Sequence, residues 1–162
     1  MYSPLATCRR SFGIVAMLCL IAGGTVTSCS DAVEPVTYND YLRELQAICS
    51  STTEQLLALP SAPEQITVAD LAASAAGLLD AEATQANRLD VPSGDDVPVD
   101  DLDGDHRAFV RNTQEQAEAW LAVGIAGPDE LAESTQLIAQ LVGGRNELAD
   151  SMGAPSCVRG DL

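Results

Sequence analysis

Basic residues are scarce in this chain of 162 residues, and lysine is absent altogether. Eight arginines stand against 24 acidic residues, and none of the acidic residues lies within the first 28 positions. Because Arg9 and Arg10 belong to that leader, the remaining chain carries six arginines and a net charge of −18. A protein this acidic repels phosphate backbones and anionic head groups, which excludes nucleic-acid binding and favours cations or basic partners.

Histidine and aromatic residues are also rare. His106 is the only histidine, and aromatic residues make up 4% of the chain. A di-metal site in a helical bundle needs paired Glu-x-x-His motifs, which one histidine cannot supply. Glycine-rich phosphate loops and haem motifs are missing too. We therefore expect no catalytic centre and no cofactor, and we expect His106, beside Arg107, to be an exposed polar residue.

The first 28 residues are organised like an export signal. Two arginines at positions 9 and 10 precede an apolar run over 12–21. The last three residues of the leader and the residue that follows it resemble a bacterial lipobox, Val26-Thr27-Ser28-Cys29. In that motif the cysteine thiol receives a diacylglyceryl group and becomes the new N-terminus. We predict a signal peptide over 1–28 and a lipid on Cys29 that holds the protein on the outer face of the cell membrane.

Other interpretations of the leader stay open. Plain secretion is one, and an uncleaved membrane anchor is another, although an apolar run of roughly 17 residues is at the short limit for a spanning helix. Arg9-Arg10-Ser11-Phe12 also resembles the core of a twin-arginine export signal, but Cys8 stands where Ser or Thr is usual. The sequence does not decide between the general and the twin-arginine export routes.

The five cysteines separate into two groups. Cys8 and Cys19 leave with the leader and Cys29 takes the lipid, so Cys49 and Cys157 remain in an oxidising compartment. Two thiols there normally form a disulfide. A redox or metal role lacks support, because the pair forms no CxxC motif and has no neighbouring histidine. The predicted bridge closes a loop of about 108 residues, for which the chain-entropy estimate is about 4.7 kcal/mol.

Four segments of the mature chain carry helical periodicity. They follow a short polar tether over 29–36 and precede a tail over 158–162, and their approximate ranges are 38–59, 68–89, 105–123 and 128–152. Thr37 and Thr67 are predicted N-caps, and Pro128 is predicted at the first helical position. No segment alternates with period two. The pattern predicts an all-α, up-down-up-down four-helix bundle over 37–157, closed by the Cys49–Cys157 disulfide.

Each predicted helix has one face that we expect to be buried. In chain order these faces contain Leu42, Leu45, Ile48, Cys49, Thr52, Leu56, Leu59; Leu71, Ala75, Leu78, Leu79, Ala86, Leu89; Phe109, Thr113, Gln116, Ala117, Trp120, Leu121; and Leu131, Ile138, Leu141, Val142, Leu148, Met152. Glu82 falls on the second face and interrupts it. Gly143 and Gly144 lie inside the fourth helix, where we expect a bend, and Gly153 and Pro155 end it.

The predicted disulfide agrees with this topology. Cys49 lies about 16 Å along the first helix at roughly 1.5 Å per residue. Cys157 follows Met152 by five residues, which in extended form also reach about 16 Å. The tail can therefore fold back along the first helix and close the bridge.

Several short motifs resemble a group of small actinobacterial helical lipoproteins. These motifs are Ala47-Ile48-Cys49, Leu59-Pro60, Leu89-x-x-Pro92-Ser93-Gly94-Asp95 and Gly153-x-x-x-Cys157. The resemblance covers nearly all of the mature chain. It implies a helical bundle pinned by the Cys49–Cys157 bridge and implies no activity. It does not account for the aspartates that follow Asp95.

The aspartate-rich stretch over 90–105 is a minor calcium candidate through Asp101, Asp103 and Asp105. Aligning Gly104 with the sixth position of an EF-hand leaves valines at the first and twelfth positions, so both essential end ligands are missing. We expect a solvated linker whose last aspartates cap the third helix.

Two groups on the third helix have both a structural and a functional interpretation. Phe109, Trp120 and Leu121 are expected in the core, with a small apolar pocket as the alternative. Four charged residues at helical spacing are expected to form an ordinary solvated face: Arg107, Arg111, Glu115 and Glu118.

Together these patterns predict a non-catalytic binding or structural module of the cell envelope. Its partners would be the membrane, through the lipid on Cys29, and an envelope protein or small ligand. A carrier that holds a small apolar ligand among its helices is the alternative.

Overall fold

The computed structural model describes residues 35–60 and 66–160. The predicted signal peptide, Cys29 and most of the tether lie outside these residues. Within them the chain forms four α-helices and a short 3₁₀ helix, with no strand: α1 (Tyr38–Leu57), α2 (Val68–Ala86), α3 (Leu102–Ile125), α4 (Pro128–Ser151) and η1 (Pro155–Cys157). The predicted all-α class and four-helix bundle are confirmed.

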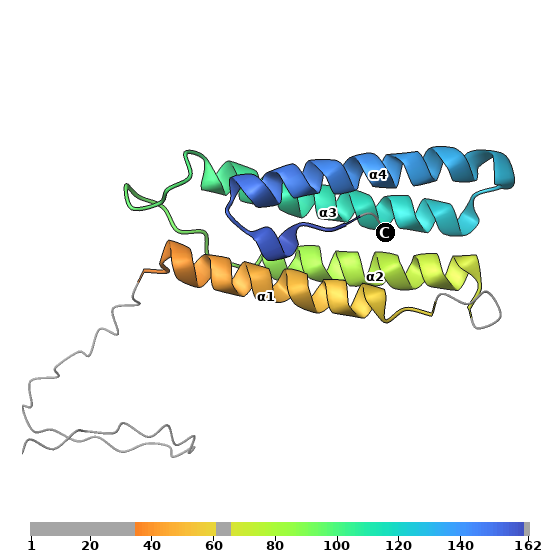
Figure 1. Ribbon diagram of the computed structural model, residues 1–162, viewed down its shortest axis with the longest axis horizontal. Coiled ribbons are helices and arrows are strands. Elements are labelled where there is room, and N and C mark those ends of the chain that lie inside the picture. The colour runs from red at the N-terminus through yellow and green to blue at the C-terminus, as the bar shows by residue number, and fades with distance from the viewer. Residues whose placement is uncertain (1–34, 61–65, 161–162) are drawn as a thin grey trace, which may run out of the picture. The chain divides into compact units, whose positions relative to one another are not determined.

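The four helices run alternately in opposite directions (Figure 1). We call the end where α1 begins and the α2–α3 loop lies the near end, and the end with the α1–α2 and α3–α4 connections the far end. Packing follows chain order, with α2 against α1 and α3, and α3 against α4. In the described chain no Cα atom of α1 comes within 8 Å of one in α4, whereas η1 contacts both helices. The C-terminal segment therefore occupies the place of a direct α1–α4 contact (Figure 1).

Local side chains fix where the first three helices begin. The hydroxyls of Thr37 and Thr67 accept the backbone N–H three residues further on, at 3.2 and 3.1 Å, as predicted. Asp101 does the same for Gly104 at 3.1 Å, so α3 begins at Leu102, three residues earlier than predicted. The earlier start adds nearly one turn, because an aspartate side chain is an efficient N-cap.

The end of α4 is set by a glycine in the left-handed region. Gly153 has φ +69°, and the N–H groups of Gly153 and Ala154 donate to the carbonyls of Asp150 and Ala149 at 3.0 and 2.8 Å. This pattern is a Schellman motif, which a Cβ atom would strain. It turns the chain back toward η1. Upstream, the Gly143–Gly144 pair does not interrupt α4, which is continuous over Pro128–Ser151.

The near half of the bundle holds the larger side chains of the core. Tyr41, Leu45, Phe109 and Met152 are each no more than 1% exposed, and they pack around the Cys49–Cys157 disulfide. Three valines of the α2–α3 loop close this end by packing against the same cluster: Val91, Val97 and Val99. The predicted disulfide and the backward fold of the tail are confirmed.

The far half is built from smaller side chains. Alanines of α2 and α3 form two smaller clusters with residues of α1 and α4: Leu56, Ala75, Ala76, Leu79 and Ala117, and Ala72, Ala119, Val123, Ile138 and Val142. A Cβ atom at Gly124 would lie 3.2 Å from the Cβ atom of Ala72, so α2 and α3 approach closely here.

Two residues predicted to be buried in this half are exposed, Leu121 by 52% and Leu131 by 41%. The close α2–α3 approach leaves Leu121 outside the seam. Leu131 lies in the first turn of α4, whose only helical neighbours are α3 and η1.

Candidate functional site

The most buried polar groups form a charge cluster between three parts of the chain. Glu82 of α2 accepts from Arg145 of α4 through one carboxylate oxygen and from Arg159 of the tail through the other. Glu82 and Arg145 are fully buried, and Arg159 is 4% exposed. The interruption that Glu82 makes in the predicted apolar face is therefore an ion-pair position. Arg145 and Arg159 could not be identified from the sequence. A carboxylate on an apolar helix face indicates a buried basic partner, but it does not indicate which residue that partner is.

The same cluster fastens the tail to α4. Arg145 also donates to the backbone carbonyl of Cys157 and lies 4.8 Å from the ring centre of Phe109. Asn146 holds the backbone of Arg159 at both polar atoms, with N···O distances of 2.7 and 2.8 Å. These contacts complete the core between α1 and α4.

Two guanidinium groups against one carboxylate leave the cluster with an excess positive charge. Burial lowers the pKa of Arg145 to about 10, and the neighbouring Glu82 carboxylate opposes that shift, so Arg145 is charged at neutral pH. Three buried N–H positions have no hydrogen-bond partner among the described residues: Nε of Arg145, and Nε and Nη1 of Arg159. All three charged side chains are buried among the described residues, and their contacts hold α2, α4 and the tail together.

The expectation that His106 is exposed was wrong. His106 is 4% exposed and lies on the inner face of α3, where its Nδ1 atom is 2.9 Å from the hydroxyl oxygen of Tyr41. Burial lowers the pKa of this imidazole, which keeps it neutral near pH 7. Because α3 begins three residues early, His106 is in the second turn of the helix and turned toward α1. Burial also raises the pKa of Tyr41.

The three aspartates of the calcium candidate have separate structural partners. Asp101 caps α3, Asp103 pairs with Arg107 at 2.7 Å, and Asp105 accepts from the Ser151 hydroxyl at 2.8 Å. Within residues 35–60 and 66–160, no three His, Cys, Asp or Glu side chains are arranged to hold a metal ion. The expectation that an aspartate of this stretch caps the third helix is confirmed.

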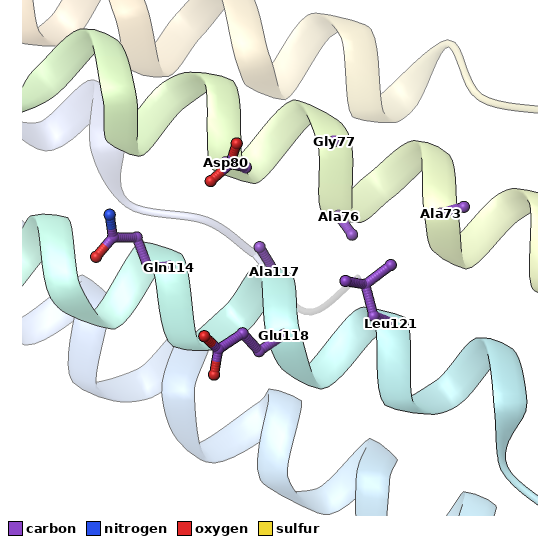
Figure 2. A pocket seen from close by; sticks show the side chains of 8 residues that line it. All are labelled: Ala73, Ala76, Gly77, Asp80, Gln114, Ala117, Glu118 and Leu121. Atoms are coloured by element: carbon purple, nitrogen blue, oxygen red, sulfur yellow. The ribbon is translucent and has the colours of Figure 1, made fainter.

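A groove of about 520 Å³ runs along the surface between α2 and α3 (Figure 2). Each helix lines it with four residues at i, i+3, i+4 and i+7: Ala73, Ala76, Gly77 and Asp80 from α2, and Gln114, Ala117, Glu118 and Leu121 from α3. Ala76 and Ala117 are buried and form the floor. In Figure 2 Leu121 lies across from Ala73 and Ala76, while Asp80, Gln114 and Glu118 gather further along.

The groove exists because α2 has almost no side chains on this face. Ala73 and Gly77 are exposed, and a Cβ atom added at Gly77 would meet nothing within 4 Å. The wall on the α3 side is the Leu121 side chain. Phe109 and Trp120, which were considered with Leu121 for a pocket, pack in the core instead, Phe109 fully and Trp120 in part.

Most of the exposed large hydrophobic residues of the described chain lie in the far half. Of the eight, six are in the last turns of α1 and α3 or in the early turns of α2 and α4: Leu57, Val68, Leu121, Ile125, Leu131 and Leu137. Ile125 is 88% exposed. A gathering of this kind at one end of a molecule marks an interaction site more often than scattered single residues do.

Basic side chains are also distributed unevenly. The stretches 51–87 and 112–144, which include all of α2, hold eight exposed acidic residues among their described positions and no Arg, Lys or His. The exposed arginines lie toward the near end: Arg43, Arg88, Arg107 and Arg111. The predicted solvated face of α3 is confirmed, since Arg107, Arg111, Glu115 and Glu118 are all exposed.

No helix of the described residues is long and apolar enough to cross a membrane. Comparison with protein-family models, with curated proteins and with solved structures finds no match. The geometry of the far half is therefore the basis for assigning a function.

Proposed function

We propose that this protein is a lipid-anchored component of the cell envelope that binds another envelope component, without catalysis, through the far half of its bundle. The observation that carries the binding role is the open groove between α2 and α3, together with the exposed hydrophobic residues at the same end of the bundle. Covering large hydrophobic side chains that are exposed to water lowers the free energy, so such side chains at one end of a molecule favour the binding of a partner there.

The lipid anchor and the outward location rest on the leader and on the cysteines. The leader ends in a lipobox-like motif at Cys29. The Cys49–Cys157 disulfide supports export, because such bonds persist in oxidising compartments and are rare in the cytosol.

The carrier alternative has one observation in its favour. A volume of about 520 Å³ falls within the roughly 300–1,000 Å³ range of small-molecule sites. The groove is open along its length, however, and Asp80, Gln114 and Glu118 make one end of it polar. An elongated partner that lies on the surface suits this shape better than an enclosed ligand.

The anchor is tested by the intact mass of the membrane-extracted protein with and without reductant and alkylating agent. We expect a chain that begins at Cys29 and carries a diacylglyceryl group, with two thiols alkylated only after reduction. A mass that retains residues 1–28, or free thiols at Cys49 and Cys157, would overturn the location.

The binding role is tested by photocrosslinking in intact cells. A benzophenone amino acid is placed at Gly77 in the groove or, as the matched control, at Gly143 on α4. Both glycines are exposed and helical, and neither has an atom within 4 Å of an added Cβ. We expect one discrete adduct from position 77 and none from position 143. Equal crosslinking from both positions, or none from either, would contradict a binding role for this face.

A further inference from the structure

We infer that the partner of the far half is a basic amphipathic helix of another protein, which lies along the groove between α2 and α3. This inference rests on the proposed binding role and adds the chemistry of the partner. It is drawn from the charge of the far half, the shape of the groove and the occupants that this charge disfavours.

Charge decides the polar side of the partner. The stretches that build α2 and the far parts of the other helices hold eight exposed acidic residues in the described chain and no basic one. At the groove itself Asp80 and Glu118 stand on opposite helices, both exposed. In the described chain the salt bridges lie elsewhere, at Arg43, Arg107 and in the buried cluster. A partner with lysines or arginines on its flanks would supply the missing positive charge and be steered toward this face.

The shape of the groove determines which apolar side chains the partner must present. The two rows of lining residues each span seven positions, or about 10 Å at roughly 1.5 Å per residue. The apolar lining residues of α2 are all small, Ala73, Ala76 and Gly77, and they leave room for a neighbouring helix to approach. On the other side of the groove, α3 provides Leu121 as an apolar contact. A helix that presents apolar residues at i, i+3 or i+4 and i+7 matches such a groove. Its end would reach toward Ile125 and Val68, the most exposed hydrophobic residues at the adjoining helix ends.

Other occupants are opposed by the same charge. A second copy of this chain would bring an equally acidic surface against this one, and like charges that face each other across an interface weaken association. Anionic lipid head groups and nucleic acid are repelled for the same reason. A basic polypeptide is the occupant that combines attraction with an apolar surface.

The test uses the mature lipoprotein in nanodiscs of neutral phosphatidylcholine. The probe is a labelled Leu/Lys amphipathic helix of about 18 residues, and a Leu/Glu helix of the same pattern is its control. Binding is followed by fluorescence anisotropy at two salt concentrations. We expect the Leu/Lys helix to bind, with an affinity that falls as salt rises, and the Leu/Glu helix not to bind.

Two pairs of variants locate the site. Gly77→Leu fills the groove, whereas Gly143→Leu makes the same change at an exposed position of α4; we expect the first to weaken binding about tenfold or more and the second to leave it unchanged. Asp80→Asn with Glu118→Gln is expected to weaken binding and its salt dependence, while Glu44→Gln with Glu147→Gln removes two exposed charges elsewhere and serves as control.

The outcomes separate this inference from the proposed function. Failure of the Leu/Lys helix to bind, equal effects of the two leucine variants, or equal binding of the Leu/Glu helix would overturn the basic helix as partner. A concentration-dependent dimer that Gly77→Leu abolishes would replace it with a second copy of the chain. In each case an adduct from position 77 in cells would still support the binding role, and loss of that adduct would end it.

Discussion

In the near half of the bundle, aromatic side chains, a disulfide and a buried charge cluster lock the core, whereas alanines and a few aliphatic side chains fill the far half. The near half ties the tail to α1, α2 and α4 through Cys157 and Arg159. The far half keeps Leu121 and Ile125 in solvent. Strong packing and exposed apolar surface are thus separated within one small bundle, and the half proposed to bind a partner is not the half that holds the fold together.

The strongest destabilisation is expected from a change at Glu82. Glu82→Gln removes the only carboxylate of the buried cluster and leaves the guanidinium groups of Arg145 and Arg159 unpaired. We expect a loss of about 3–5 kcal/mol in the free energy of unfolding, measured by chemical denaturation. Glu147→Gln, an exposed change on α4, should stay within about 0.5 kcal/mol. Similar unfolding curves for the two variants would contradict the structural role of the cluster.

The second effect comes from the disulfide. Replacing Cys49 and Cys157 together by alanine frees a loop of 108 residues, for which we expect a loss of about 4 kcal/mol at most. Hydrogen exchange should show that amides of η1 and of α1 around Leu45 lose protection before those of α2 around Ala76. Uniform loss of protection along the chain would show that the two halves unfold as one unit.

The third effect depends on pH and on His106. In the unfolded chain this imidazole takes a proton near pH 6.5, whereas burial lowers its pKa in the folded state. Below pH 6.5 the unfolded state therefore binds more protons than the folded state. The free energy of unfolding then decreases as the pH is lowered, until the pH reaches the lowered pKa of the folded state. The slope is at most about 1.4 kcal/mol per pH unit. Urea midpoints between pH 7.5 and 5.5 should fall less for His106→Gln; an unchanged pH dependence would argue against a neutral buried imidazole.

The smallest effect is expected at Leu121, in the far half. Leu121→Asn should change stability by no more than about 0.5 kcal/mol, because the side chain is 52% exposed. Leu45→Ala, at a fully buried leucine of the near half, should cost about 2–5 kcal/mol. Denaturation curves of both variants measure the contrast. A large loss from Leu121→Asn would mean that this side chain supports the fold and is not reserved for a partner.

The number of helices, the starts of α1, α2 and α4 and the disulfide could be predicted because each rests on local or countable signals. Apolar residues recur at helical spacing, Thr37 and Thr67 stand just before such runs, and only two cysteines follow the predicted lipid site. These signals need no knowledge of which helix lies beside which.

The buried charge cluster and the groove could not be predicted in the same way. The partners of Glu82 lie 63 and 77 positions further along the chain, so only the tertiary fold, which gathers α2, α4 and the tail, brings them together. Leu121 carries the periodicity of a core residue, and its exposure follows from how closely α3 approaches the small residues of α2. The absence of basic residues over 51–87 and 112–144 was readable from the sequence alone, but only the structure shows that Asp80 and Glu118 of these two stretches line one groove.

The tail that lies between α1 and α4 also determines when the chain can finish folding during its synthesis. Arg159 lies 77 positions after Glu82 in the chain, and without it one oxygen of the buried Glu82 carboxylate loses its partner. A chain synthesised only as far as α4 therefore cannot complete its core, because the segment that contacts both α1 and α4 is still missing. Folding of the bundle then waits for the segment around Cys157 and Arg159, and a product truncated before Cys157 leaves Glu82 and Arg145 without their partners in the tail.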